Sequence, residues 1–189
     1  MAPRIWREWR EARQLNRRAA AYVASIRAEP ADTDAHWLAE SATRGDLDHA
    51  RWELRYARRA LGLIAAERDA LDDRTPSAIA RELTASLARE PLVDATKLEV
   101  AERQFNQRLR AYAEVLAERT GSEPTAARLG RTLLTFAGGG FTPSQADVER
   151  AGALASAYLA DGSAALQKVF GAAELPEHIS PSAAAAGRG

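Results

Sequence analysis

Two histidine–glutamate pairs carry the residue types and the spacing closest to a metal site. His36 with Glu40, and His49 with Glu53, stand four positions apart, so each pair shares one face of a helix. A turn expected near residue 45 folds the second pair back on the first and places Glu40 opposite His49 and His36 opposite Glu53. Imidazole and carboxylate groups that converge in this way are ligands for zinc and other divalent metals.

Two further observations argue against a metal ion. The apolar positions of the first segment, Leu38 and Ala42, turn His36 and Glu40 sideways. The paired Glu-x-x-His pattern of di-iron bundles is absent from the sequence. Local ion pairs on a solvated surface account for the same residues. We therefore predict no metal site and no cofactor, with the same four residues as the candidates should a metal bind.

A small-molecule pocket near His49, Trp52 and Tyr56 is the second interpretation, and it would make the protein a ligand-binding bundle or an enzyme. The remaining sequence offers little other chemistry. It contains no Cys, which excludes thiol catalysis and Cys-ligated metals. The three glycines at 138–140 lack the lysine and the preceding strand of a phosphate-binding loop. We name no catalytic residue and expect a non-catalytic protein.

The N-terminal helix is the most informative segment for function. Residues 4–29 contain seven arginines and three glutamates, a net charge of +4, while the whole chain is neutral with 26 basic and 26 acidic residues. Tryptophan and arginine are enriched at protein interfaces because each combines a large contact area with a polar end. The residues predicted to bind a protein partner or a second copy are Ile5, Trp6, Trp9, Arg13 and Asn16.

The apolar positions of this helix follow steps of four and three, as in a coiled-coil seam. Asn16 falls on that seam, where it would fix the register of a paired helix. The alternative is that four of its residues pack against the central helix of the same chain: Ile5, Trp9, Val23 and Ile26. Attachment to an anionic membrane surface is a third interpretation, and it is weaker because three glutamates interrupt the helix and lysine is absent from it.

The periodicity of the apolar residues predicts an all-α protein. β-Branched residues are sparse and never alternate, while apolar residues recur at three- and four-residue steps. Two long central helices are expected, one from Leu47 to about Leu71 and one from Asp94 to about Thr120. The first repeats apolar residues in heptad steps that end at Leu71 and has a second apolar stripe, so we expect it at the centre of the fold.

Capping residues and glycines mark the ends of the shorter helices. Gly45 and Asp46 predict a tight corner, with Asp46 as the N-cap of the first long helix. Thr75 is expected to cap the next helix, with a proline after it. The capping-box pattern that begins at Thr142 starts a further helix through Leu159. A separate short helix is expected at about 166–170.

We predict one antiparallel helical bundle with several short peripheral helices. Its parts are the amphipathic helix at 1–30, the bundle core at 31–174 and a disordered tail at 175–189. No signal peptide and no membrane span are visible, which indicates a cytoplasmic protein. The balanced charge argues against general nucleic-acid binding. The expected function is that of an assembly, adaptor or accessory subunit that associates through its N-terminal helix, with self-association included.

Overall fold

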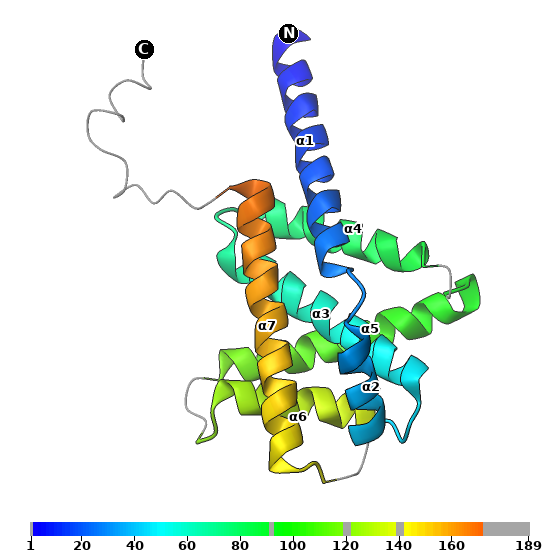
Figure 1. The fold of residues 1–189 in the computed structure, drawn as a ribbon. Helices are drawn as coiled ribbons and strands as arrows, with labels where there is room; N and C mark the ends of the chain where they lie inside the picture. Colours follow the sequence, from blue (N-terminus) through cyan, green and yellow to red (C-terminus); the bar gives the residue numbers. More distant parts are fainter. Residues whose placement is uncertain (1, 91–92, 119–121, 139–141, 172–189) are drawn as a thin grey trace.

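The computed structural model describes residues 2–90, 93–118, 122–138 and 142–171. These residues form a single all-α domain of seven packed helices, and no strand occurs among them. The helices are α1 (Ala2–Ile26), α2 (Asp32–Ser41), α3 (Leu47–Asp69), α4 (Arg74–Ala88), α5 (Ala95–Ala117), α6 (Thr125–Gly138) and α7 (Gln145–Phe170). The predicted all-α fold class is thus confirmed (Figure 1).

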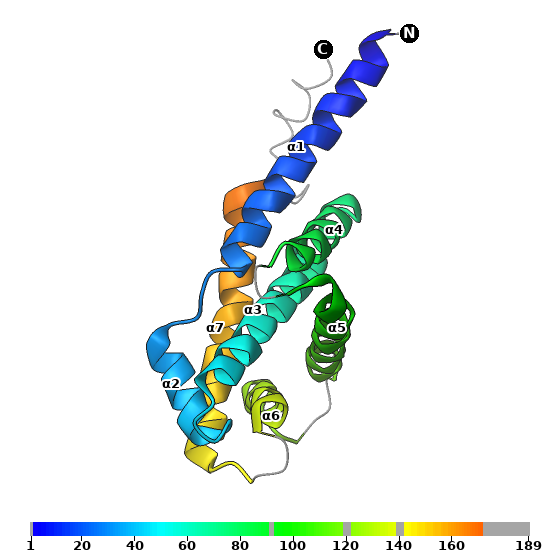
Figure 2. The ribbon, with the colours of Figure 1, turned by 90° about the vertical axis from the view of Figure 1, so that its right-hand side faces the viewer.

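Helix α3 forms the centre of the molecule. It contacts α1, α2, α4, α5, α6 and α7, which are grouped around it (Figure 2). Leu54 and Leu61 from one apolar stripe are fully buried, and Tyr56 and Leu63 from the second are almost fully buried. The central position predicted from two apolar faces is therefore confirmed, because residues of both stripes are buried among the surrounding helices.

The corner between α2 and α3 has the predicted chemistry. Gly45 adopts a φ of +85°, a conformation that favours glycine. The Asp46 side chain accepts a hydrogen bond of 2.9 Å from the backbone N–H of His49 and caps α3. Similar caps start the later helices, since Asp94 precedes α5 and Ser144 precedes α7 with side chains bonded to backbone N–H groups.

The start of α4 differs from the sequence prediction. Helix α3 ends at Asp69, so Leu71 leaves the predicted heptad seam and is 67% exposed. The side chain of Asp72, rather than that of Thr75, accepts hydrogen bonds from the N–H groups of Arg74 and Thr75, at 2.8 and 2.7 Å. Because the Asp72 carboxylate, two residues before Arg74, satisfies these N–H donors, α4 begins at Arg74.

The predicted separate helix at about 166–170 is also wrong, because α7 continues unbroken from Gln145 to Phe170. Gly162 does not end the helix but lets it approach α3. A Cβ at this glycine would lie 3.0 Å from the Cα of Gly62 and 3.0 Å from the Cβ of Ala65. The small residue is therefore used for close helix packing.

In the part of the chain that the structure covers, no helix is both long enough and apolar enough to cross a membrane. The predicted disordered tail, residues 175–189, lies outside the described residues, so that prediction stays open.

Candidate partner-binding surface

Helix α1 has two halves with opposite environments. Ala19, Tyr22, Val23 and Ile26 are at most 3% exposed and belong to the core of the domain; we call this half the root. Every side chain from Trp6 to Gln14 is exposed. We call residues 2–14 the arm, because this stretch projects beyond the other helices in both views (Figures 1 and 2).

The root is fixed to α3 by a close contact and a hydrogen bond. The hydroxyl of Tyr22 donates to the carbonyl of Gly62 at 2.6 Å. Burial first, and then the nearby Asp69 carboxylate, raise the pKa of the Tyr22 hydroxyl, so it remains a donor. A Cβ at Gly62 would lie 2.6 Å from the Cγ2 atom of Ile26, so only glycine allows α1 to lie this close to α3. The direction of the arm is set at this crossing.

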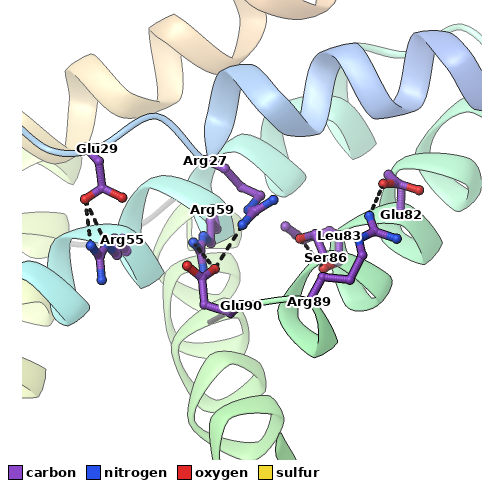
Figure 3. A network of polar contacts seen from close by, with 9 residues as sticks. All are labelled: Arg27, Glu29, Arg55, Arg59, Glu82, Leu83, Ser86, Arg89 and Glu90. Atoms are coloured by element: carbon purple, nitrogen blue, oxygen red, sulfur yellow. Dashed lines mark hydrogen bonds and ion pairs between the residues drawn. The ribbon is translucent and has the colours of Figure 1, made fainter. Parts of the chain in front are cut away.

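A partly buried network of charges holds the chain where α1 ends (Figure 3). Arg27 and Arg59 both donate to the Oε2 atom of Glu90, at 3.1 and 2.9 Å. The Arg59 side chain is only 1% exposed. Next to this network, Arg55 binds Glu29 at 2.8 Å and holds the segment that follows α1. These pairs connect α1, α3 and the end of α4.

Burial and charge oppose one another in this network. Burial lowers the pKa of the Arg59 guanidinium, while the charge of Glu90 works against that shift. For Glu90, burial favours the neutral acid, but the charge of Arg59 and the hydrogen bond from Arg27 outweigh it and lower the pKa of the carboxyl. Glu90 is therefore ionised at neutral pH and holds two arginines at once.

Two indole rings and two arginines follow one line along the arm. Trp6, Trp9, Arg10 and Arg13 occur at helical steps of three, four and seven, and we call them the Trp/Arg stripe. Trp6 is 62% exposed and Trp9 is 52% exposed. Their ring centroids lie 6.0 Å apart in an edge-on arrangement, and the Arg13 guanidinium lies 5.2 Å from the centroid of Trp9. The stripe contains no carboxylate.

The structure divides the residues of the predicted α1 seam into two groups. Val23 and Ile26 pack within the same chain, as the alternative interpretation expected, whereas Trp9 does not. Asn16 is exposed on the same helix, so its role in setting a register stays a prediction. Ile5 belongs to α1, but its side chain lies outside the described part of the structure.

The residues predicted for a ligand pocket line one cleft between α3 and α5. His49, Trp52 and Tyr56 contribute to it from α3, and Lys97 and Gln104 face them from α5. The cleft has a volume of about 480 Å³. The rings of Trp52 and Tyr56 lie 5.6 Å apart, and the Tyr56 hydroxyl donates to the Oε1 atom of Gln104 at 3.4 Å. The three predicted residues therefore share one cleft, and its binding of a small molecule stays a prediction.

The charged groups at the buried side of this cleft satisfy one another. Glu53 and Arg108 form a bidentate pair with side-chain exposures of 4% and 9%. The remaining terminal nitrogen of Arg108 donates to the Gln104 carbonyl at 2.9 Å, and the guanidinium lies 5.0 Å from the Tyr56 ring centroid. This buried ion pair links α3 to α5. We assign no ligand to the cleft.

The metal candidates do not converge on one point. His49 lies 3.4 Å from Glu53, whose carboxylate is occupied by Arg108. His36 is exposed and its Nδ1 atom lies 2.7 Å from the Asp32 carbonyl. No group of three or more His, Cys, Asp or Glu residues suited to a metal ion occurs within the described ranges.

Sequence reasoning missed the buried arginines, although a signal for them existed. Arg59 lies three positions after Tyr56 and four before Leu63, and it therefore belongs to the second apolar stripe of α3. Arg108 lies between Phe105 and the buried Tyr112 in the same way. An arginine inside an apolar stripe indicates a buried ion pair, because a buried charge requires a partner.

When the chain is compared with protein-family models, with curated proteins and with solved structures, none of the three comparisons gives a match. The arguments about function therefore rest on the residues themselves.

Proposed function

We propose that this protein acts by binding another protein through the Trp/Arg stripe of its arm, as a non-catalytic assembly, adaptor or accessory subunit. The observation that carries the proposal is the exposure of Trp6 and Trp9 on a helix segment that projects from the domain. Two adjacent exposed indoles form an apolar patch, and such patches mark interaction sites on folded proteins.

The charge of α1 supports a partner with an acidic surface. The helix contains six arginines and two glutamates, and the remainder of the chain is net acidic. Arg13 lies over the face of Trp9, so its guanidinium is held beside the indole and its N–H groups stay available to carboxylates. A matching partner surface combines an apolar pocket for the indoles with acidic residues around it.

The projecting position of the arm points to the same conclusion. A short helix without tertiary contacts is marginally stable in water. The root is fixed in the core and provides formed helical turns from which the arm extends. The apolar side chains of the arm, however, stay in water. Docking on a partner removes that apolar surface from water and stabilises the arm.

The experiment is an affinity capture with the full chain from the cells that produce it, followed by a binding measurement with each purified candidate. The test variant is Trp6→Ala/Trp9→Ala, and the control is Val100→Ala, which truncates an exposed apolar residue of α5. We expect the double variant to bind the purified partner at least about tenfold more weakly and the control to bind normally. Unchanged binding of the double variant contradicts the proposal.

Substitutions test the arm more cleanly than removal of residues 1–30, because that deletion also removes the buried root. Vesicles with anionic and with neutral headgroups complete the experiment. Binding of the full chain to anionic vesicles alone, with loss in the Trp variant and no protein partner, would replace the proposal by the membrane interpretation. The ligand-binding alternative stays a prediction for the cleft between α3 and α5.

A further inference from the structure

A second cleft lies beside α1, where the arm meets the root. Its walls come from three parts of the chain: residues 11–18 of α1, the connection at 69–75 between α3 and α4, and residues 166–171 at the end of α7. Its volume is about 460 Å³. Figure 1 shows that the arm continues past the end of α7, so the cleft and the arm belong to the same end of the molecule.

The walls of this cleft carry apolar side chains that other helices leave partly or fully exposed. Leu71 is 67% exposed, and Leu15 and Phe170 are partly buried. The large exposed hydrophobic residues of the described chain are Trp6, Trp9, Leu71 and Val100. Three of these four lie on the arm or in this cleft, so apolar surface is concentrated at one end.

The charged side chains that line the cleft include one more acid than base: Glu11, Asp69 and Asp72 against Arg18 and Arg74. The stretch 67–74 contains four acidic and two basic residues, and its acids are Glu67, Asp69, Asp72 and Asp73. Hydrogen bonding from Arg68 lowers the pKa of Asp69. Burial opposes ionisation of Asp72, but hydrogen bonds from the Thr75 backbone and hydroxyl outweigh it and lower the pKa of the carboxyl. Both groups are carboxylates at neutral pH, close to exposed Leu71.

We propose that this cleft receives the Trp/Arg stripe of a second copy of the chain. The inference rests on the proposed function and names the partner as another copy. The indoles of one copy would contact Leu71 and Phe170 of the other, and the arginines of the stripe would face the acidic stretch 67–74. An Arg/Trp stripe and an apolar cleft with carboxylates at its rim are complementary in both charge and polarity.

Neither indole of a chain lines that chain's own cleft. Trp6 precedes the cleft residue Leu15 by nine positions, which is about 14 Å along a continuous helix. A rigid helix carries the indoles away from the cleft, so only another molecule brings the two together. Since each copy has one arm and one cleft at the same end, mutual exchange satisfies both and closes a two-fold dimer.

Light scattering and sedimentation of the full chain over a range of concentrations test the proposal, with circular dichroism to confirm folding. The arm variant is Trp6→Ala/Trp9→Ala and the cleft variant is Leu71→Lys, which alters an exposed residue and adds a charge that repels the arm. The matched control is Val100→Lys on α5. We expect the full chain and the control to dimerise, and each of the two test variants to dissociate with a Kd raised by about thirtyfold or more.

Mixing the two variants provides the decisive measurement. The arm variant keeps an intact cleft and the cleft variant keeps intact indoles, so a mixed dimer retains one of the two contacts. Native mass spectrometry of the equimolar mixture should show the mixed dimer well above either homodimer. A full chain that dimerises without any enrichment of the mixed species overturns the arm-to-cleft contact.

Two other outcomes separate this inference from the proposed function. A full chain that stays monomeric, but loses a different purified protein partner on Trp6→Ala/Trp9→Ala substitution, overturns the inference and leaves the proposed function in place. A chain shortened after Gly171 tests the other occupant, residues 172–189, because Gly171 itself lines the cleft. If the shortened chain no longer dimerises, that segment makes the contact and the inference is overturned.

Discussion

Helix α3 and the arm of α1 are both amphipathic and rich in arginine, but their arginines differ in the contacts that they make with the rest of the chain. On α3, Arg51, Arg55, Arg58 and Arg59 each bind a carboxylate from another part of the chain at 2.8 to 3.4 Å. Within the described residues, Arg7, Arg10 and Arg13 of the arm form no ion pair with another helix. Similar composition therefore serves internal cohesion in one helix and leaves contact groups available in the other.

The comparison predicts that polar substitutions on α3 reduce stability and that those on the arm do not. The largest effect is expected for Glu53→Gln, which leaves Arg108 buried without its charged partner. We expect a loss of about 3 kcal/mol in the free energy of unfolding, measured by urea denaturation.

The matched control for this prediction is Glu99→Gln, because Glu99 is exposed in its ion pair with Arg103 and a small effect follows. The double variant Glu53→Gln/Arg108→Gln should lose less free energy of unfolding than the sum of the two single variants. Each single change leaves the other charged group buried without a partner. Additive losses would show that the pair does not act as a unit.

Substitution of Gly62 tests how the root holds the arm. In Gly62→Val the new side chain must displace Ile26, so we expect destabilisation of about 2 kcal/mol by overpacking. Thermal denaturation followed by circular dichroism measures it. Ala24→Val, at an exposed position of α1, is the control for adding volume and branching to a helix. Equal effects of the two variants would argue against the close crossing of α1 and α3.

The Glu90 network predicts a specific dependence on pH. Glu90→Gln should cost about 1–2 kcal/mol at pH 7, because a neutral amide replaces the acceptor of two arginines. The folded-state pKa of Glu90 is lowered, so its stabilising contribution is complete above the usual range for glutamate and is lost as the pH falls through the folded-state value.

Urea denaturation of wild type and Glu90→Gln at several pH values measures this difference. The gap between the two proteins should be constant near neutrality and should close in acid. A gap that widens as the pH falls would mean that Glu90 is bound in its protonated form.

The smallest effect on stability is expected for Trp6→Ala/Trp9→Ala. Neither indole contacts the core, so the free energy of unfolding of the monomer should change by less than about 0.5 kcal/mol. Denaturation at a concentration where the chain is monomeric measures it. A loss of 2 kcal/mol or more would place the arm within the cooperative unit of α3 and remove the contrast between the two helices.

The sequence predicted those features that depend on neighbouring residues. The Asp46 cap, the Gly45 corner and the two apolar faces of α3 each require only short segments of chain. Periodicity also identified the α1 seam, but it treats Trp9 and Val23 alike, although one is exposed and the other buried. What separates them is where α4 and α7 end, which no pattern within α1 records.

The candidate surfaces were predictable to different degrees. The Trp/Arg stripe and the aromatic side of the cleft on α3 are visible as helical spacing. The cleft beside α1 is not, because stretches near positions 15, 71 and 170 build it together. Leu71 was assigned to a seam by heptad counting, and the earlier end of α3 instead leaves it in water.

The uninterrupted path of α1 from its root to its tip has a geometric consequence. Tyr22 is held on the Gly62 carbonyl, and Trp6 lies sixteen positions away, about 24 Å along one stiff rod. The indoles therefore keep a constant bearing relative to α3. A molecule that binds the indoles is therefore held at one orientation to the whole domain. The complex then has a defined shape and not the variable geometry of a flexible connection.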